Sequence, residues 1–413
     1  MSKIISLSLS PNTQRDDISL AFNIIFSPLK WKEGKEIKEL ENTFKNKFSF
    51  KNAFSFNSGR SSLIAILNSM KISRGDEIIV QAFTCNAAVN PIISVGAKPV
   101  FVDINDALNI DSKKIKEKIT AKTKAVMIQH TFGYPAQIDE IKKICEDNNI
   151  YLIEDCAHAL GAKYKDRYCG SFGDASFFSF GRDKVISSVY GGMVVVNNDK
   201  LTYEVIAFKE KIEQPSSLWI LQQLLHPVLM NMFVLPLYGS IIGKALLAGF
   251  LNLSILSKAV TKQENVGVLP NYFPKRMPNG LATLALNQIK KIDIMNGHRE
   301  EIAELYRQSL ERNDRFKIVF KKDDNIKPVF LKFPVLVYDQ KRAIERMREN
   351  NIYLNDGWME SVVAPPKTSL DKVCYFVGSC PRAEKIVKAI VSLPTHVNIS
   401  RYDAEKIIKC LIG

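Results

Sequence analysis

The chain has 413 residues, 46% of them hydrophobic, which is enough to bury a large core and favours two or more domains. Its net charge of +14 points to nucleic acid, an anionic membrane surface or phosphorylated ligands as partners, but no nucleic-acid motif accompanies the charge. Seven cysteines without a CxxC pair argue against a disulfide framework and a structural zinc site. The first residues contain too short an apolar stretch for a secretory signal, so we expect a cytoplasmic protein with reduced thiols.

The N-terminal half shows the pattern of an α/β domain. Residues 30–48, KWKEGKEIKELENTFKNKF, interleave lysines with acids and predict an amphipathic helix with a solvated face. Between residues 50 and 200, helical patterns alternate with short apolar strands. These strands are EIIVQAF, KPVFVDI, AVMIQH, NIYLIED and GGMVVVNN. The alternation predicts an α/β fold with a mainly parallel sheet sandwiched by helices.

A glycine-containing turn precedes the first of these strands. The sequence NSGRSSL leads into the helical pattern IAILNSM, so Gly59, Arg60 and Ser61 stand at an expected helix N-terminus. Backbone N–H groups at such a position form an anion site. We interpret the three residues as phosphate ligands, and a plain helix N-cap is the alternative.

Two residues further along predict a cofactor. Asp155 ends the apolar strand YLIED, and in a parallel sheet such strand ends line the ligand crevice. Lys184 follows in FFSFGRDKVISSVYGG. A lysine amine forms a Schiff base with pyridoxal 5'-phosphate, and a buried carboxylate keeps the pyridine nitrogen protonated. The pair therefore predicts a pyridoxal-phosphate site, although each residue alone also fits a strand-end acid or a solvated lysine.

Residues 214–263 contain no Asp or Glu. Their only charged side chains are Lys244, Lys258 and Lys262. The apolar residues at helical spacing are Leu218, Leu221, Leu225, Val228, Leu229 and Met232. Pro227, Pro236 and Gly239 are expected to break the stretch into pieces too short to cross a membrane. The segment is then either an interfacial helical hairpin lying on a membrane, or a hydrophobic cover buried over the active site or a dimer interface.

The pattern changes from about residue 290. A charged helix is expected at 296–312, a strand pair around 329–338, and helices at 340–350 and 383–392. This predicts a smaller C-terminal α+β domain that closes over the first. We divide the chain into a large cofactor-binding domain at 1–262, with an apolar insertion at 214–263, and a small domain at 263–413.

Several motifs occur in a fixed order. They are NSGRSSLIAIL, GDEIIVQAFTCNAAVNPIISVGAKPVFVDI, HTFGYPAQIDEI, IEDCAHALGAKY, FGDASFFSF and LPTHVNIS. Together they resemble the signatures of the DegT/StrS family of nucleotide-sugar aminotransferases, from about residue 34 to the C-terminus. The resemblance implies an aspartate aminotransferase-like fold, pyridoxal phosphate and a homodimer. It also implies amino transfer from glutamate to a keto-sugar on a nucleotide diphosphate, in surface polysaccharide or amino-sugar biosynthesis.

The resemblance extends the phosphate site and also shows departures from the family pattern. It implies that Ser179 adds a hydroxyl to the cofactor phosphate. Arg60 and Ser61 replace the usual Thr and Ala, so the Arg60 side chain either strengthens anion binding or points toward a substrate phosphate.

Three further positions depart from the family pattern. Position 85 usually carries an aromatic ring that stacks on the cofactor, and Cys85 does not stack in that way. His158 stands where Gln is frequent, so it contacts the phenolate oxygen or the ring of the cofactor, or is a satisfied buried histidine. Pro274 replaces an Asn that reaches the cofactor phosphate of a neighbouring subunit.

The resemblance assigns transamination to this site, with Lys184 as the general base for proton shifts and Asp155 stabilising the pyridinium. Relatives that deoxygenate sugars typically replace the lysine by His, and Lys184 argues against that reaction. Two alternatives stay open. One is a membrane-associated aminotransferase that acts on a lipid-linked sugar, and the other is a non-catalytic regulatory or scaffold protein with the same fold.

Overall fold

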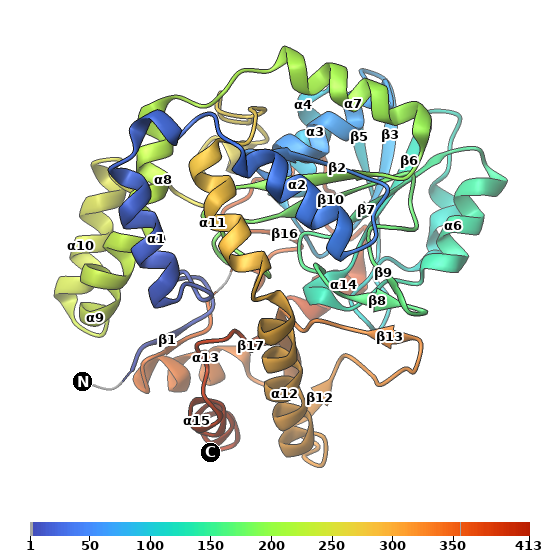
Figure 1. The fold of residues 1–413 in the computed structure, drawn as a ribbon. Helices are drawn as coiled ribbons and strands as arrows, with labels where there is room; N and C mark the ends of the chain where they lie inside the picture. Colours follow the sequence, from blue (N-terminus) through green and yellow to red (C-terminus); the bar gives the residue numbers. More distant parts are fainter. Residues whose placement is uncertain (1–2, 356) are drawn as a thin grey trace.

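The centre of the molecule is a seven-stranded sheet in the order β2-β11-β10-β7-β6-β3-β5 (Figure 1). The computed structural model describes residues 3–355 and 357–413. The strands are β2 (Asn52–Phe56), β3 (Glu77–Gln81), β5 (Lys98–Val102), β6 (Thr123–Gln129), β7 (Tyr151–Asp155), β10 (Ala175–Ser179) and β11 (Gly192–Val196). Strand β11 is antiparallel to both of its neighbours, and the other neighbouring pairs are parallel. The predicted α/β fold with a mainly parallel sheet is confirmed.

Helices cover both faces of this sheet, as a parallel sheet requires. Successive strand residues point to opposite faces. Ile78 and Val80 of β3 therefore belong to one core, and Ile79 between them belongs to the other. The helices on the first face include α3 (Gly59–Ser69), α4 (Asn86–Ser94) and α7 (Asp199–Lys211); those on the second include α2 (Glu36–Lys47), α6 (Ile138–Asp147) and α11 (Asn279–Ile289).

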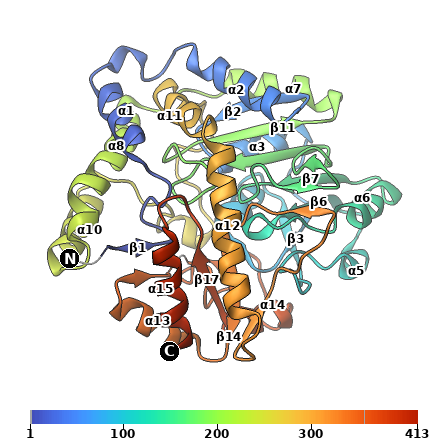
Figure 2. The ribbon, with the colours of Figure 1, turned by 60° about the horizontal axis from the view of Figure 1, so that its bottom comes forward.

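The C-terminal part is built on a three-stranded antiparallel sheet in the order β12-β14-β17. Its elements are α12 (Ile292–Leu310), β12 (Phe316–Ile318), β14 (Lys332–Val337), α13 (Gln340–Glu349), α14 (Pro381–Ile386), β17 (Ile390–Pro394) and α15 (Arg401–Ile412). Figure 2 shows α12, α13 and α15 beside this sheet.

Two predicted elements of this part were wrong. The strand pair expected around 329–338 is the single strand β14, because the N–H groups of Val329 and Leu331 donate to Gly133 and Phe132 of the large domain. The helix expected at 383–392 ends early. Its last residues form β17, whose pairing with β14 and complete burial outweigh helical spacing.

Elements from the two ends of the chain pack across the expected domain boundary. Helix α11 packs against α2 and α1 (Arg15–Ile25), while β1 (Ile5–Ser6) pairs with β15 (Ile352–Tyr353). The boundary at residue 263 stays a prediction. The remaining short elements are η1 (Pro28–Lys30), β4 (Thr84–Cys85), α5 (Ser112–Ile115), η2 (Lys116–Lys118), η3 (Thr131–Gly133), β8 (Lys163–Tyr164), β9 (Arg167–Tyr168), η5 (Glu264–Val266), β13 (Ile326–Lys327) and β16 (Val363–Ala364).

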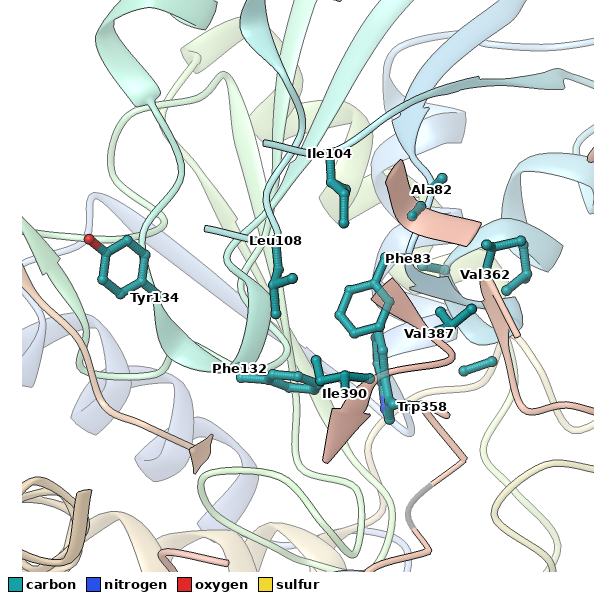
Figure 3. Packing of buried hydrophobic residues seen from close by; sticks show 14 of the residues in the cluster. Ala82, Phe83, Ile104, Leu108, Phe132, Tyr134, Trp358, Val362, Val387 and Ile390 are labelled. Atoms are coloured by element: carbon teal, nitrogen blue, oxygen red, sulfur yellow. The ribbon is translucent and has the colours of Figure 1, made fainter. Parts of the chain in front are cut away.

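An aromatic cluster joins the large domain to the C-terminal part (Figure 3). The rings of Phe83 and Phe132 lie 5.8 Å apart, and Trp358 lies 5.4 Å from the first and 5.2 Å from the second. All three side chains are buried. Edge-to-face ring contacts add to the stabilisation that comes from burial. The cluster therefore holds the C-terminal part against the central sheet, beside the candidate site.

The insertion folds as a helical arm at the edge of the molecule. It contains α8 (Ser217–Leu229), a π-helix (Met230–Val234), α9 (Leu235–Leu237) and α10 (Ile241–Asn252). The run Ser217–Leu237 has 21 residues and a mean hydropathy of 1.4 over its most apolar window, so it is long and apolar enough to cross a membrane, and 50% of that window is buried.

The expectation that prolines break this run was wrong. Pro227 lies inside α8 and is followed by the π-helix, in which Asn231 Nδ2 donates to the Pro227 carbonyl at 2.8 Å. Pro236 lies in the first turn of α9, where its missing N–H costs little.

Helix α8 packs against α1 and α11 with Trp219, Ile220 and Leu224 buried. Of the apolar residues expected at helical spacing, Val228 is buried, whereas Leu218 is 78% exposed and Met232 57% exposed. The packing partners decide which of two apolar faces enters the core.

Candidate active site

A cavity of about 510 Å³ lies at the carboxyl ends of β6, β7 and β10. It is lined by these predicted site residues: Gly59, Arg60, Cys85, Asp155, His158, Ser179 and Lys184. The structure therefore brings together residues that the sequence separates widely, as expected for strand ends at one edge of a parallel sheet.

Asp155 is the last residue of β7 and is 5% exposed. Its Oδ1 accepts a hydrogen bond from the Ala157 N–H at 3.0 Å. Burial raises the pKa of this carboxyl to about 6. A buried carboxylate needs a nearby cation, and the protonated nitrogen of a pyridine ring supplies one. The carboxylate thus fits pyridoxal phosphate.

Lys184 lies in the loop between β10 and β11, and its Nζ is 3.0 Å from His158 Nε2. Burial, together with Lys184 and Lys332, holds the pKa of His158 well below its usual range, so the ring is neutral. Its Nδ1 accepts the Phe132 N–H at 3.4 Å, which fixes the orientation of the ring. The other ring nitrogen therefore lies against the Lys184 amine, the group that forms a Schiff base with a carbonyl.

Two residues that the sequence did not reveal hold the lysine loop. Asn12 Nδ2 donates to the Lys184 carbonyl, and Arg299 donates to Asn12 Oδ1 at 2.8 Å and to the Val185 carbonyl at 2.7 Å. Arg299 is fully buried, and burial lowers its pKa to about 9. In the sequence this arginine belongs to a charged helix and gives no signal of a buried role.

The N-terminus of α3 forms a cradle for an anion. Ser58 caps the helix by accepting the Ser61 N–H at 3.0 Å, while the N–H groups of Gly59 and Arg60 have no acceptor among the described residues. A Cβ at Gly59 would lie 3.1 Å from the Ser179 Cβ, so the Ser179 side chain lies directly beside this turn. A phosphate fits between them.

Ser61 does not line the cavity. Its side chain is fully buried, and its hydroxyl donates to Asn57 Oδ1 at 2.6 Å. The N–H and the hydroxyl of Ser61 therefore both form hydrogen bonds within the turn. Ser61 supports the cradle from outside the cavity.

The Arg60 side chain leaves the cradle and contacts the end of the insertion. Its Nε lies 2.5 Å from Glu264 Oε1, and it donates to the Ala259 carbonyl at 2.8 Å. Arg182, two residues before the lysine, donates to Ser257 Oγ. Both arginines thus bind the insertion to the catalytic loops.

Cys85 is the N-cap residue of α4, and burial raises the pKa of its thiol, which stays protonated. Pro274 is not among the cavity-lining residues. The insertion supplies lining residues that the sequence did not assign to the site: His226, Met230, Leu247, Leu251, Lys258, Ala259 and Val260.

A buried polar cluster lies behind Asp155 without lining the cavity. One ligand atom each from His130, Glu154 and Cys156 lies within 4.8 Å of the others. Glu154 already accepts three N–H groups from the loop 170–173 and pairs with His130 Nε2, while His130 Nδ1 accepts the Ala136 N–H. These bonds make the cluster a structural support.

A helix-covered parallel sheet with a lysine, a buried strand-end carboxylate and an anion cradle in one cavity defines a pyridoxal-phosphate enzyme of the aminotransferase type. The chain belongs to the DegT/DnrJ/EryC1/StrS aminotransferase family, whose model matches residues 13–214 and 256–412. The predicted family, the pyridoxal-phosphate-dependent sugar aminotransferase class and the cofactor are confirmed. The unmatched residues 215–255 fall inside the insertion.

The chain is similar to GDP-perosamine synthase of Escherichia coli O157:H7, with 40% identity over 178 residues, 43% of this chain and 49% of that protein. It is 28% identical to the spore coat polysaccharide biosynthesis protein SpsC of Bacillus subtilis (strain 168), over 92% of this chain and 89% of SpsC. The fold resembles the PLP-form of the putative sugar aminotransferase Spr1654 from Streptococcus pneumoniae, with TM-score 0.74 and 20% identity over 100% of this chain and 97% of that one.

Borohydride reduction should fix the cofactor to Lys184, because this is the cavity lysine whose amine is held in place, 3.0 Å from His158 Nε2. The Lys184→Ala variant should lose the covalent label and turnover while keeping some phosphate-held cofactor, and peptide mass spectrometry would locate the label. Lys258→Ala, which removes another cavity lysine, is the matched control and should keep the label. Label on Lys258 or Lys332 would contradict the assignment.

Asp155→Asn should stabilise the cofactor-free enzyme and inactivate the loaded one. The folded carboxyl has its pKa raised from 3.8 to about 6, so its ionisation costs stability above pH 6, and the cost vanishes below about pH 4. We expect a gain of up to about 3 kcal/mol at pH 7.5 and little change at pH 4, with half-reaction rates with the amino donor reduced by about two orders of magnitude or more.

Thermal melts at the two pH values and absorbance-monitored half-reactions measure these effects. Asp183→Asn is the control, because the pKa of Asp183 is lowered despite burial, by Lys184 and Lys332. This variant should not gain stability. Near-normal half-reaction rates in Asp155→Asn would remove Asp155 from the mechanism.

His158→Leu should slow proton transfer by about 10² while cofactor binding is kept, because the Lys184 amine loses its hydrogen-bond partner. His158→Gln should recover part of the rate, since its amide also forms a hydrogen bond. A larger solvent isotope effect in His158→Leu would identify the proton step. Equal rates in His158→Leu and the unmodified enzyme would exclude this role.

Proposed function

We propose that this enzyme transfers an amino group from glutamate to a keto-sugar carried on a nucleotide diphosphate, in surface polysaccharide or amino-sugar biosynthesis. The observation that carries the proposal is the single cavity in which Asp155, Lys184 and the α3 cradle meet. Its volume of about 510 Å³ lies within the range of small-molecule sites.

The chain's own residues have distinct tasks. Pyridoxal phosphate, when bound, supplies an electron sink that makes the carbon next to the transferred nitrogen acidic. Lys184 Nζ would take the proton from that carbon and return it one position away, and the contact with His158 Nε2 keeps the amine oriented. Asp155 would hold the charge on the ring nitrogen, and the α3 N-terminus with Ser179 would hold the phosphate.

The substrate class is inferred from relatives. One similar protein is a GDP-perosamine synthase, and another is a spore coat polysaccharide biosynthesis protein. The first name points to an amino sugar linked to a nucleotide, and the second points to the biosynthesis of a surface polysaccharide. Glutamate as donor, a homodimer and a cytoplasmic location are further parts of the proposal, supported by the family pattern.

A second candidate is amination of a lipid-linked sugar. It is favoured by the cavity wall that the insertion builds from Met230, Leu247 and Leu251, because apolar side chains suit an apolar substrate group. No contact in the described part of the chain favours the non-catalytic alternative.

A substrate screen tests the proposal. Purified enzyme loaded with pyridoxal phosphate is incubated with glutamate, glutamine or alanine, and each keto-sugar is offered as a nucleoside diphosphate or a polyprenyl diphosphate derivative. We expect product with glutamate and a nucleotide-linked keto-sugar, measured by mass spectrometry, and none with Lys184→Ala. Turnover of the polyprenyl derivatives alone would favour the second candidate.

A further inference from the structure

The insertion presents an apolar surface to solvent, which we call the insertion face. Its members are Leu218, Met232, Phe233, Ile241, Ile242 and Leu253. They are six of the 18 large apolar side chains that are exposed in the described part of the chain. Scattered apolar residues need no explanation, but such a concentration in one arm marks a contact surface.

Charge limits what this surface can bind. The segment 214–263 has no acidic residue, and Lys244, Lys258 and Lys262 are all exposed. Apolar side chains with lysines and without acids match a lipid surface that carries anionic headgroups.

The insertion is also tied to the catalytic loops. Besides the contacts of Arg60 and Arg182 with residues 257–264, the Tyr190 hydroxyl donates to the Lys258 carbonyl at 2.6 Å. Met230 and Leu247 line the cavity from the inner side of the arm. Some residues of the arm therefore close the site, while the apolar side chains of the insertion face are exposed to solvent.

The burial of helix α8 limits the ways in which the arm can contact a membrane. Trp219, Ile220 and Leu224 of the long helix are buried against α1 and α11, so if this helix left the protein to span a bilayer, it would expose to water the sides of α1 and α11 that it covers. Figures 1 and 2 show α8 and α10 at one edge of the molecule, away from α6 and α14. The exposed side chains at that edge are available for shallow insertion.

We propose that the insertion face docks peripherally on an anionic lipid membrane, through its apolar side chains and the lysines of residues 214–263. The docked arm places the wall of the catalytic cavity next to the lipid surface. This inference goes beyond the amino-transfer reaction, and it is testable without a sugar substrate.

Sedimentation with vesicles tests the proposal. Cofactor-loaded enzyme is mixed with vesicles of phosphatidylcholine alone or with about 30% phosphatidylserine. We expect sedimentation with the anionic vesicles, weakened but not abolished between about 0.1 M and about 0.5 M salt, because the apolar part is not screened. Failure to sediment with either vesicle would overturn the proposal.

Matched variants locate the contact. Ile241→Glu/Ile242→Glu changes residues that are 86% and 61% exposed, and it should lower vesicle partitioning by about tenfold or more. Phe376→Glu/Val377→Glu changes residues that are 73% and 77% exposed in the loop before α14, and it should leave partitioning unchanged. Equal losses in both variants would overturn the assignment.

A third variant and two controls separate the remaining outcomes. Lys244→Gln/Lys262→Gln should remove the preference for anionic vesicles and keep the salt-insensitive part. Borohydride labelling of Lys184 in every variant shows that the catalytic domain is folded. If Ile241→Glu/Ile242→Glu instead lowers the molar mass in light scattering and the unmodified enzyme ignores vesicles, the face joins two copies and the membrane proposal is wrong.

Discussion

The burial of the Asp155 carboxylate is the constraint around which the site is arranged. A charge removed from water at the end of a central strand is costly unless a cation reaches it, and here burial raises the carboxyl pKa to about 6. The described residues give this group one backbone hydrogen bond. The buried charge thus destabilises the cofactor-free protein, and a bound pyridinium would offset this loss of stability. Folding stability is therefore coupled to cofactor binding.

The position of Lys184 depends on parts of the chain far from it in sequence. Asn12 from the N-terminal segment and Arg299 from α12 hold the backbone of the lysine loop, and His158 from the end of β7 holds the amine. The hydrogen bonds of the buried Arg299 fix this loop. Phe132 and Trp358 pack around His158, so the contact between the central sheet and the C-terminal part also orients the histidine.

The insertion is a structural part of the catalytic site. Its end is held by Arg60 and Arg182, and its helices supply Met230, Leu247 and Leu251 to the cavity wall. The family model matches the residues on either side of the insertion and leaves residues 215–255 unmatched. The inferred role of this segment therefore rests on two of its physical properties. It lacks acidic residues, and it has two apolar faces.

The sequence by itself determined the α/β class, the central strands and the residues Asp155 and Lys184, because these depend on local periodicity and on strand ends that meet at one sheet edge. It did not determine the use of Ser61, the direction of the Arg60 side chain or the helical run through Pro227. It also gave no sign of Asn12 or Arg299, since a lone polar residue has no local pattern. The buried face of α8 and the change from helix to β17 were decided by long-range packing, where the area buried against a partner exceeds the weak local preference of the backbone.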